Sequence, residues 1–433
     1  MCEPVILSYL KNLYKEYPIG HNISTKLINA KADAAANNEP CIWDHVIVRQ
    51  NGPFVILHYD TKFMYEGCWD DFNGALRECR GIVIDTMHWE VAAWPYNKFF
   101  NYGEKSETQP KVIAKRIKEA EVVQVADKLD GSLLNIRWYN NKFIVATSTF
   151  MTYGKLDDDC CSLYLNVPEE ASVLRKAIKY MMDYNLSYLN TIKRYFDYTF
   201  MFEFLSDEVV HVVDYIKKGM SGFYLHGLRN MITAKCLSYK EVVELASELN
   251  IPHTSYYADM TLADVLLEKP KYDFKDKEGY VLYIDGYFLK VKCDQYINKA
   301  AQEQRLLNPN GIMKLYTLGT LDEATDDLNI EQKAFVNKIK DEIENYISFV
   351  TNAVDAFYKQ IEAKSTDKRS FFEELNKYKR RSMLVKLLSM KYLNGKDFDL
   401  LVTPQGRVLC YTHMLENIEK IQKEMKEFGV EGA

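Results

Sequence analysis

The stretch Lys128-Leu129-Asp130-Gly131-Ser132 decides how this chain folds and what chemistry it can carry. It lies between two apolar runs with strand character, residues 122–126 and 133–138. A lysine in this position is held by a rigid sheet at the mouth of whatever pocket the sheet lines. Its reference pKa of about 10.4 keeps it protonated at neutral pH, so a nucleophilic lysine needs nearby cations or burial to lower that pKa.

The bulk composition is that of an ordinary soluble protein. The 433 residues suffice for two or three domains, and 47% of them are apolar and 27% charged. No apolar run approaches the ~20 residues that span a bilayer, and the first residues lack the basic region of a signal peptide. The nine cysteines include no Cys-x-x-Cys pair. We therefore expect a cytoplasmic protein without a structural zinc site.

The net charge of −6 argues against a protein that coats nucleic acid through a uniformly positive surface. It is compatible with a nucleic-acid enzyme whose cations are confined to one groove. We expect a monomer that does not bind membranes.

The pattern of apolar residues predicts an α+β domain with antiparallel sheets over residues 1–300, followed by an all-helical domain over residues 301–433. The breaker at residues 307–311 marks the change. Predicted strands are 44–48, 54–58, 81–84, 91–94, 122–126, 133–138, 142–147, 198–204, 222–228, 279–284 and 287–291. Predicted helices are 4–14, 171–195, 239–249, 262–268, 331–363, 369–393 and 411–428, and residues 429–433 are predicted to fray.

Alone, the lysine motif is compatible with a strand followed by a turn, in which Asp130 and Gly131 serve turn geometry. Other segments add charges to apolar runs. Glu203 interrupts an apolar strand, and Glu278 precedes a glycine at the start of another. The remaining charges are Lys290 and Lys292, which share one face of the last predicted strand, and Arg80 and Lys98, which lie beside apolar residues.

Each of these charges alone fits a solvated strand face. Together they fit a phosphate-and-metal site, in which cations neutralise a polyphosphate and carboxylates hold Mg²⁺. Two lysines on one face repel each other unless an anion or a carboxylate lies between them, and their proximity is expected to lower the pKa of Lys128.

The order of these segments resembles the covalent nucleotidyltransferase superfamily of ATP-dependent ligases and mRNA capping enzymes. Within it, the chain is most similar to the bacteriophage-type RNA ligase 1 family. In the order of the superfamily's motifs I, III, IIIa, IV and V, the matching residues are Lys128, Glu203, residues 225–229 more loosely, Glu278 with Gly279, and Lys290 with Lys292. Residues 78–81 and 98–101 resemble the pattern that this family carries before its nucleophile. The resemblance covers roughly residues 75–300.

The resemblance implies an ATP-grasp-like nucleotidyltransferase domain and an ATP-dependent RNA ligase. The implied reaction forms a lysyl-AMP on Lys128, transfers AMP to an RNA 5′-phosphate and joins that end to a 3′-hydroxyl. Implied cofactors are ATP and Mg²⁺, for which Mn²⁺ can substitute. Implied partners are single-stranded or nicked RNA, including tRNA in a repair pathway such as that of a bacteriophage-infected host cell.

The resemblance also implies roles for the individual residues. Lys290 and Lys292 would steady the α-phosphate, Glu203 would contact the ribose or the metal, and Glu278 would hold Mg²⁺. The remaining candidates are Arg80 and Lys98 for the terminal phosphates or the RNA 5′-phosphate, Asp130 and Gly131 for ATP, and Phe100 and Tyr280 either beside the adenosine or in the core.

Three points stay open at the level of sequence. Residues 145–150 carry no cation where the family can have one. A DNA ligase or capping enzyme is an alternative, although both normally continue into a β-barrel, and so is a non-catalytic RNA-binding protein on a ligase scaffold. Residues 359–396 hold eleven Lys or Arg against four Asp or Glu. The basic cluster there, Lys377, Lys379, Arg380 and Arg381, fits an RNA contact and a solvated helix face equally well.

Overall fold

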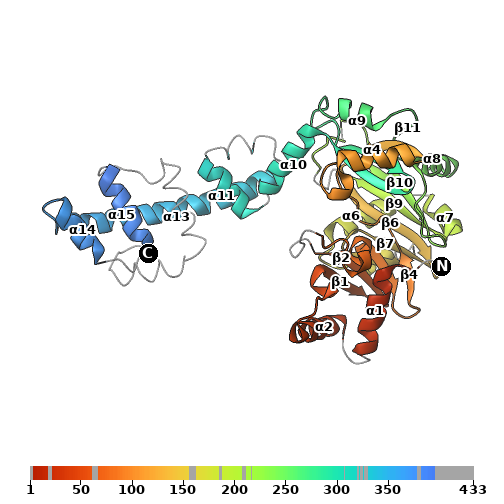
Figure 1. Ribbon diagram of the computed structural model, residues 1–433, viewed down its shortest axis with the longest axis horizontal. Coiled ribbons are helices and arrows are strands. Elements are labelled where there is room, and N and C mark those ends of the chain that lie inside the picture. The colour runs from red at the N-terminus through yellow and green to blue at the C-terminus, as the bar shows by residue number, and fades with distance from the viewer. Residues whose placement is uncertain are drawn as a thin grey trace. The chain divides into compact units, whose positions relative to one another are not determined.

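The computed structural model describes residues 3–17, 22–60, 67–155, 162–184, 188–206, 211–215, 217–306, 308–318, 321, 325, 330–377 and 382–394. The chain divides into two compact units, Met1–Ile297 and Asn298–Ala433. Figure 1 shows that the first unit contains the strands and that the second is helical where it is described. No helix of the described residues is long and apolar enough to cross a membrane.

Three sheets form the first unit, and every strand pairing between described residues in named strands is antiparallel. The predicted α+β class with antiparallel sheets is therefore confirmed. In spatial order, the first sheet contains β1 (Val46–Asn51), β2 (Phe54–Tyr59), β3 (Arg80–Asp85) and β4 (Glu90–Ala93). The second contains β10 (Gly222–Asn230), β9 (Tyr198–Leu205), β6 (Ser132–Tyr139), β7 (Lys142–Ala146) and β8 (Met151–Gly154), and the third β11 (Tyr256–Tyr257), β5 (Val123–Lys128), β12 (Gly279–Ile284) and β13 (Tyr287–Lys292).

The lysine motif connects two of these sheets. Strand β5 of the third sheet ends at Lys128, and β6 of the second sheet begins at Ser132. The three residues between them carry the chain from one sheet to the other. Lys128 therefore stands where two rigid sheets meet, as the sequence predicted.

Helices cover the sheets through apolar faces. The helices of the first unit are α1 (Val5–Glu16), α2 (Ile23–Asn37), α3 (Ala75–Glu78), α4 (Pro110–Glu119), α5 (Ser162–Leu165), α6 (Ser172–Asp183), α7 (Tyr188–Ile192), α8 (Tyr239–Glu248) and α9 (Leu262–Glu268), and α10 (Asp294–Leu306) follows the last strand. Helix α6 buries Leu174, Ile178 and Met181 in the same core as Phe202 and Phe204 of β9. Because alternate strand residues face opposite sides of a sheet, Glu203 between those phenylalanines faces away from this core.

Glu78 has a structural position that the sequence pattern did not reveal. Its two carboxylate oxygens accept hydrogen bonds from the backbone N–H groups of Val5 and Ile6, at 3.1 and 2.9 Å. These donors lie in the first turn of α1, whose N-cap residue Pro4 provides no side-chain cap. Glu78 is buried, and burial raises the pKa of its carboxyl group. It therefore fixes α1 against the segment that leads into β3.

The predicted elements differ from the observed ones in a few places. The predicted helix 171–195 consists of α6 and α7 with a short 3₁₀ turn after α7. Strands β8 and β11 were not predicted, and neither were helices α2, α3, α4, α5 and α10. Helix α2 has a weak apolar periodicity, with only Ile23 and Lys26 buried, and β11 spans only two residues.

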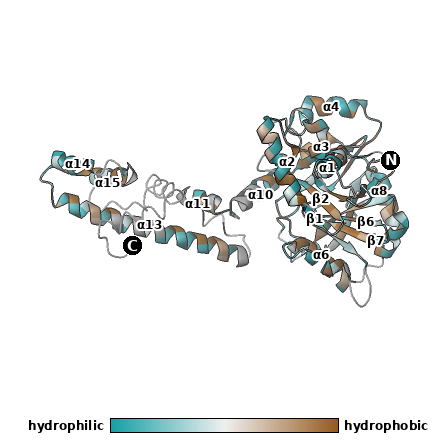
Figure 2. Ribbon diagram, turned by 90° about the horizontal axis from the view of Figure 1, so that it is seen from below, coloured by the Kyte–Doolittle hydropathy of each residue, from teal (hydrophilic) through white to brown (hydrophobic). Residues whose placement is uncertain are grey.

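The second unit contains α11 (Pro309–Leu318), α13 (Ile330–Glu362), α14 (Lys368–Asn376) and α15 (Ser382–Asn394). Figure 2 shows polar and apolar residues mixed along α13, as expected of an amphipathic helix. Apolar residues of these four helices, including Ile343, Phe371 and Leu388, form a separate core. The helical prediction is confirmed for the described residues, whereas the predicted helix 411–428 and the end at 429–433 lie outside them.

Candidate active site

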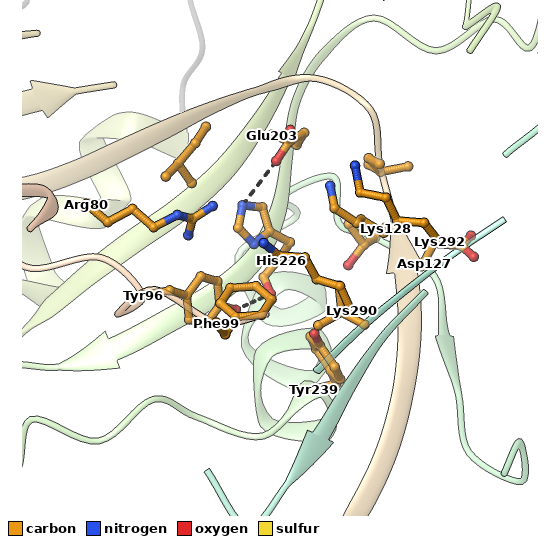
Figure 3. Close-up of a pocket in the computed structure, with 14 residues that line it drawn as sticks. Arg80, Tyr96, Phe99, Asp127, Lys128, Glu203, His226, Tyr239, Lys290 and Lys292 are labelled. Carbon is orange, nitrogen blue, oxygen red and sulfur yellow. Dashed lines mark hydrogen bonds and ion pairs between the residues drawn. The ribbon is translucent and has the colours of Figure 1, made fainter. Parts of the chain in front are cut away.

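A cavity of about 170 Å³ lies where the second and third sheets meet. Four cations line it: Arg80, Lys128, Lys290 and Lys292. The remaining residues are Asp127 and Glu203, His226 and Thr254, the rings of Tyr96, Phe99 and Tyr239, and the aliphatic side chains of Leu129, Leu133 and Val281. Figure 3 shows these side chains converging from different strands. Five of the predicted site residues, Arg80, Lys128, Glu203, Lys290 and Lys292, therefore line one cavity.

Lys128 is paired with a carboxylate. Its Nζ lies 2.7 Å from Oε2 of Glu278, and its side chain is 21% exposed. Burial alone would lower the pKa of Lys128, but Glu278, Glu203 and Asp130 favour the charged form and together raise that pKa above its ordinary value. The sequence-based expectation of a lowered pKa for Lys128 is therefore wrong for the protein without substrate. The reason is that the Glu278 carboxylate contacts the ammonium group directly and outweighs the neighbouring cations.

Glu278 joins two lysines. Its second oxygen, Oε1, lies 2.9 Å from Nζ of Lys292, and its side chain is only 3% exposed. The following Gly279 is required by space, because a Cβ there would lie 2.3 Å from the carbonyl oxygen of Val291. The close approach of β12 and β13 at this point places Glu278 beside Lys292. Glu278 thus supplies a carboxylate to Lys292 and Lys128, and not to Lys290, the other lysine that the sequence placed on this face.

Lys290 lies in a different environment from Lys292, although both are on β13. Its Nζ lies 4.5 Å from the centre of the Phe99 ring, and no carboxylate among the described residues is within ion-pairing distance. Burial lowers the pKa of Lys290 to about 6, with further contributions from Arg80, Lys98 and the other lysines. Near pH 7 a large share of Lys290 is therefore uncharged, and an anion in the cavity would restore its proton.

Arg80 completes the region of unpaired cations. Its guanidinium lies 5.4 Å from the centre of the Phe99 ring, and its buried Nη1 has no hydrogen-bond partner among the described residues. Gly81 lets β3 approach the turn after β7, since a Cβ there would lie 2.6 Å from the carbonyl oxygen of Thr147. A buried donor without a partner is costly, so the Arg80 side chain is prepared for an acceptor that a ligand would bring.

Lys98 lies close to this region without lining the cavity. Its Nζ donates to the Tyr59 hydroxyl at 3.3 Å and lies 5.0 to 5.5 Å from the ring centres of Tyr59, Trp69 and Phe100. Phe100 itself is 1% exposed and belongs to the N-terminal core. The structure therefore places Phe100 in the core, and the preceding Phe99 faces the cavity. Tyr280 is also a core residue, 1% exposed.

Glu203 is buried beside the loop that follows Lys128. Its Oε1 accepts a hydrogen bond of 3.0 Å from the backbone N–H of Gly131. A Cβ at Gly131 would lie 2.7 Å from Cγ of Glu203, so the glycine of the motif is needed for this contact. Burial raises the pKa of Glu203 to about 7, although the charge of Lys128 favours the carboxylate.

Asp130 holds the loop after Lys128 rather than facing the cavity. Its Oδ2 accepts hydrogen bonds from the backbone N–H groups of Val212 and Val213, at 2.7 and 3.1 Å. Its Oδ1 accepts one from the hydroxyl of Tyr296, at 2.8 Å. Both oxygens are thus used within the protein, which indicates that Asp130 organises the loop instead of binding ATP directly.

His226 is the residue that the sequence pattern indicated most weakly. The pairing of β9 and β10 shifts between Leu225 and Gly227, so His226 is the extra residue of a β-bulge. Its Nε2 lies 3.5 Å from Oε2 of Glu203, and Figure 3 shows the Arg80 guanidinium pointing toward it. Burial, with the charges of Arg80 and Lys128, lowers the pKa of His226 to about 3, so the imidazole is neutral.

The bulge is supported by Tyr96. The Tyr96 hydroxyl donates to the His226 carbonyl at 2.8 Å, and the two rings stack with centres 5.6 Å apart. A Cβ at Gly227 would lie 1.9 Å from that hydroxyl, so glycine is required there. The His226-Gly227 pair inside an apolar strand was the signal that could have predicted this bulge.

Of the basic residues predicted in the second unit, Lys377 is exposed and pairs with Glu374 three residues earlier. Lys379, Arg380 and Arg381 lie outside the described residues. Likewise, no group of three metal-ligating side chains occurs among the residues that the structure describes.

Fold and cavity together define the class: an antiparallel α+β domain with a lysine at the junction of two sheets and a cluster of cations around it, as in nucleotidyltransferases. The family is more specific. The sequence profile of the RNA ligase family matches residues 78–297, just over half of the chain, and the chain belongs to this family. The matched segment contains every predicted residue of the first unit's site. A search among curated proteins gave no match.

Comparison with solved structures gave several RNA ligases. The RNA ligase of Naegleria gruberi with PPi is 18% identical, with a TM-score of 0.31, over 44% of this chain and 55% of that one. A variant of the same ligase with ATP and Mn gives 17% identity and a TM-score of 0.32, over 43% and 54% of the two chains. An archaeal ATP-dependent RNA ligase is 12% identical, with a TM-score of 0.40, over 74% of this chain and 79% of that one. The present chain thus spans little more than half the length of the Naegleria proteins.

Proposed function

We propose that this chain is an ATP-dependent RNA ligase that joins a 5′-phosphate to a 3′-hydroxyl through a lysyl-AMP on Lys128 and an RNA-adenylate. One observation carries the proposal. Lys128 shares a buried cavity with Arg80 and Lys290, and neither of these two has a carboxylate within ion-pairing distance among the described residues. A nucleophile beside unpaired buried cations fits a reaction at a phosphorus atom that carries negative oxygens.

In the first step, the neutral amine of Lys128 attacks the α-phosphorus of ATP. The N–P bond forms, the bond to the bridging oxygen breaks, and pyrophosphate leaves with the electron pair. Lys128 must first lose a proton and its contact with Glu278, because both oppose attack in the protein without substrate. The arriving phosphates are themselves hydrogen-bond acceptors for Lys292 and Lys290, which lie on β13, two strands from β5.

The residues present fit a polyphosphate. Arg80 offers the buried Nη1 that lacks a partner, and Lys290 offers an amine that an anion would recharge. Lys98, whose charge already contributes to the lowered pKa of Lys290, would act on the terminal phosphates from behind the Tyr59 and Phe100 rings. The adenosine would lie against Tyr96, Phe99, Tyr239 and His226, which form the aromatic side of the cavity.

Mg²⁺ fits this site only together with the nucleotide. Glu278 and Glu203 supply carboxylate oxygens, and the ATP phosphates would complete the coordination, as is usual for Mg²⁺ and for Mn²⁺ in its place. When bound, the ion would neutralise charge on the phosphates.

The later steps use RNA. AMP passes from Lys128 to the 5′-phosphate of one strand, and a 3′-hydroxyl then attacks that phosphate and displaces AMP. We assign the helical second unit to RNA recognition, with a nicked tRNA as the natural substrate class. The helices after β13 support a ligase of RNA over a DNA ligase or a capping enzyme, which would continue into a β-barrel.

The test is covalent labelling with α-labelled ATP and Mg²⁺. We expect the wild-type chain to retain the label through a bond that is acid-labile and alkali-stable, as a phosphoramidate is. Lys128→Ala is expected to take up no label, and Lys115→Ala, on the exposed face of α4, is the matched lysine control. Persistent labelling of Lys128→Ala would exclude this lysine as the nucleophile.

A second assay separates the ligase from a binding protein. Wild type should circularise a 5′-phosphorylated single-stranded RNA, and Lys128→Ala should still join RNA that is already adenylylated, because that step does not need the lysyl-AMP. Retarded RNA without any joined product, from wild type and with either substrate, would favour a non-catalytic RNA-binding protein.

A further inference from the structure

Next to the pair of Lys128 and Glu278 stands a second ion pair, made by the residues that precede each of them. Lys277 binds Oδ1 of Asp127 through its ammonium group. The two side chains are only 12% and 19% exposed. Strands β5 and β12 pair with Gly279 opposite Lys128 and Tyr280 opposite Asp127. In the first pair the lysine is on β5 and the acid lies just before β12. In the second pair the acid is on β5 and the lysine lies just before β12.

Three tyrosines enclose Lys277. Its Nζ lies 3.8 Å from the ring centre of Tyr280, 5.1 Å from that of Tyr257 and 5.2 Å from that of Tyr272. The Tyr257 hydroxyl also donates to Oδ1 of Asp127 at 3.0 Å. The carboxylate and the three ring faces together hold the Lys277 ammonium group in one position.

This cluster ties together three strands at the point where the catalytic residues leave them. Tyr257 belongs to β11, Asp127 to β5, and Tyr280 to β12, with Lys277 just before β12. Glu278 also precedes the first residue of β12, and its backbone carbonyl accepts a hydrogen bond of 2.9 Å from the N–H of Cys293. Its position therefore depends on how firmly the preceding residue is anchored.

We propose that Lys277 and Asp127 are positioning residues for adenylylation: their ion pair, enclosed by the three tyrosines, fixes Glu278 and Lys128 relative to each other at the ends of their strands. This inference rests on the proposed function, since it assigns a role in the lysyl-AMP step. Neither residue touches the reacting atoms in this role. They act through the strand ends, where a displacement of about 1 Å can cost a large part of the rate.

The experiment compares Lys277→Met, Lys277→Arg, Asp127→Asn and the double variant Lys277→Met/Asp127→Asn in single-turnover labelling with α-labelled ATP. Lys277→Met is expected to slow adenylylation about tenfold or more, because the strand end loses its anchor. Lys277→Arg keeps both the ion pair and the ring contacts and is expected to retain most of the rate. Joining of pre-adenylylated RNA, which needs no lysine nucleophile, is expected to change much less in every variant.

The double variant separates position from charge. Lys277→Met alone leaves the Asp127 carboxylate in the cavity lining without its ion-pair partner. Removing both charges should leave the adenylylation rate as low as in Lys277→Met, because the anchor of the strand end is still missing. A double variant with the full wild-type rate would overturn the proposal, because charge alone would then explain the single variants.

Lys269→Met is the matched control. Lys269 pairs with Asp294 in the same unit, but the pair is more exposed, at 28% and 48%, and neither residue lines the cavity. Thermal unfolding of all variants identifies any that fail to fold, and Lys277→Arg then carries the test. Equal adenylylation by Lys277→Met and Lys269→Met would refute the positioning role. Failure of wild type to take any label would instead refute the proposed function.

Discussion

Two sides of one cavity treat their cations in opposite ways. On one side, Lys128 and Lys292 share the buried carboxylate of Glu278. On the other side, Arg80 and Lys290 lie over the Phe99 ring, and no carboxylate among the described residues pairs with either. Lys290 and Lys292 are only two residues apart on β13, yet Lys292 forms an ion pair with Glu278, whereas burial lowers the pKa of Lys290 to about 6.

The difference shows which side is complete without a ligand. Buried cations without a counter-ion raise the free energy of the folded protein, and this cost is retained where a ligand anion would remove it. In the proposed function, the unpaired side is therefore the one that receives the phosphates. The paired side is satisfied within the protein, and in that proposal a ligand must disrupt the pairing before Lys128 can act as the nucleophile.

The strongest way to break this comparison is Glu278→Gln. The change removes the shared charge while keeping nearly the same shape. We expect single-turnover adenylylation to fall by about a hundredfold or more, a loss typical of removing a principal electrostatic group from an active site. Glu278 also raises the pKa of Lys128, so the residual rate should reach its plateau at lower pH than in wild type. An unchanged pH profile would mean that Glu278 does not control the protonation of Lys128.

Lys290→Met tests the unpaired side. The affinity for ATP should fall by roughly tenfold to a hundredfold, because a charge-assisted hydrogen bond to phosphate contributes about 1.5–3 kcal/mol. The free energy of unfolding should change in the opposite direction. Since the pKa of Lys290 is lowered to about 6 in the folded protein, the unfolded chain binds the extra proton between that pH and about 10.5, and the lysine destabilises the fold there.

At pH 7.5 the Met variant should therefore be more stable than wild type, by on the order of 2 kcal/mol, and the gain should shrink as the pH rises toward 10. Urea unfolding at several pH values measures this. Lys292→Met is the matched control, because it removes a paired lysine and leaves a carboxylate short of a partner. Loss of stability in both variants would show that the two sides do not differ.

The neighbouring phenylalanines sharpen the boundary of the cavity. Phe100→Leu should lower the free energy of unfolding by about 1.5 kcal/mol with little effect on ATP affinity, because Phe100 is in the core. Phe99→Leu should change the free energy of unfolding little and lower the ATP affinity severalfold, since the Phe99 ring lies beneath Arg80 and Lys290. Urea unfolding and equilibrium ATP binding on both variants provide the measurement.

The smallest expected effect is a fraction of a proton taken up when ATP binds. In the protein without substrate, much of Lys290 is uncharged above pH 6, and phosphate would raise its pKa again. Calorimetry at pH 7.5 in buffers of different ionisation enthalpy should show net uptake that is reduced in Lys290→Met. Affinity for ATP should accordingly weaken as the pH rises above about 6. Equal uptake by both proteins would assign the proton to another group.

The sequence predicted the parts of this site that depend on strand order. Lys128, Glu203, Glu278, Lys290 and Lys292 each stand at a recognisable place in an apolar run, and antiparallel pairing brings those places together. The sequence could not decide which lysine pairs with Glu278, because that depends on distances across two strand pairs. Nor could it choose between Phe99 and Phe100, since adjacent residues differ only in which side of the chain they face.

Other parts depended on irregular backbone. The bulge at His226 interrupts the alternation on which the strand prediction relied, and the side chain enters the cavity for that reason. The positions of Asp130 and Glu78 depend on hydrogen bonds to segments 82 and 72 residues away in the sequence. Such contacts leave no local periodicity from which they could be read.

The contact between Lys128 and Glu278 has a consequence for the enzyme at rest. An ammonium group is inert toward isocyanates, aldehydes and activated esters, all of which consume free amines. Without ATP, the ion pair with Glu278 thus keeps the Nζ atom of Lys128 protonated and unreactive toward these compounds. Amine-directed reagents should accordingly modify exposed lysines such as Lys115 well before they inactivate the protein.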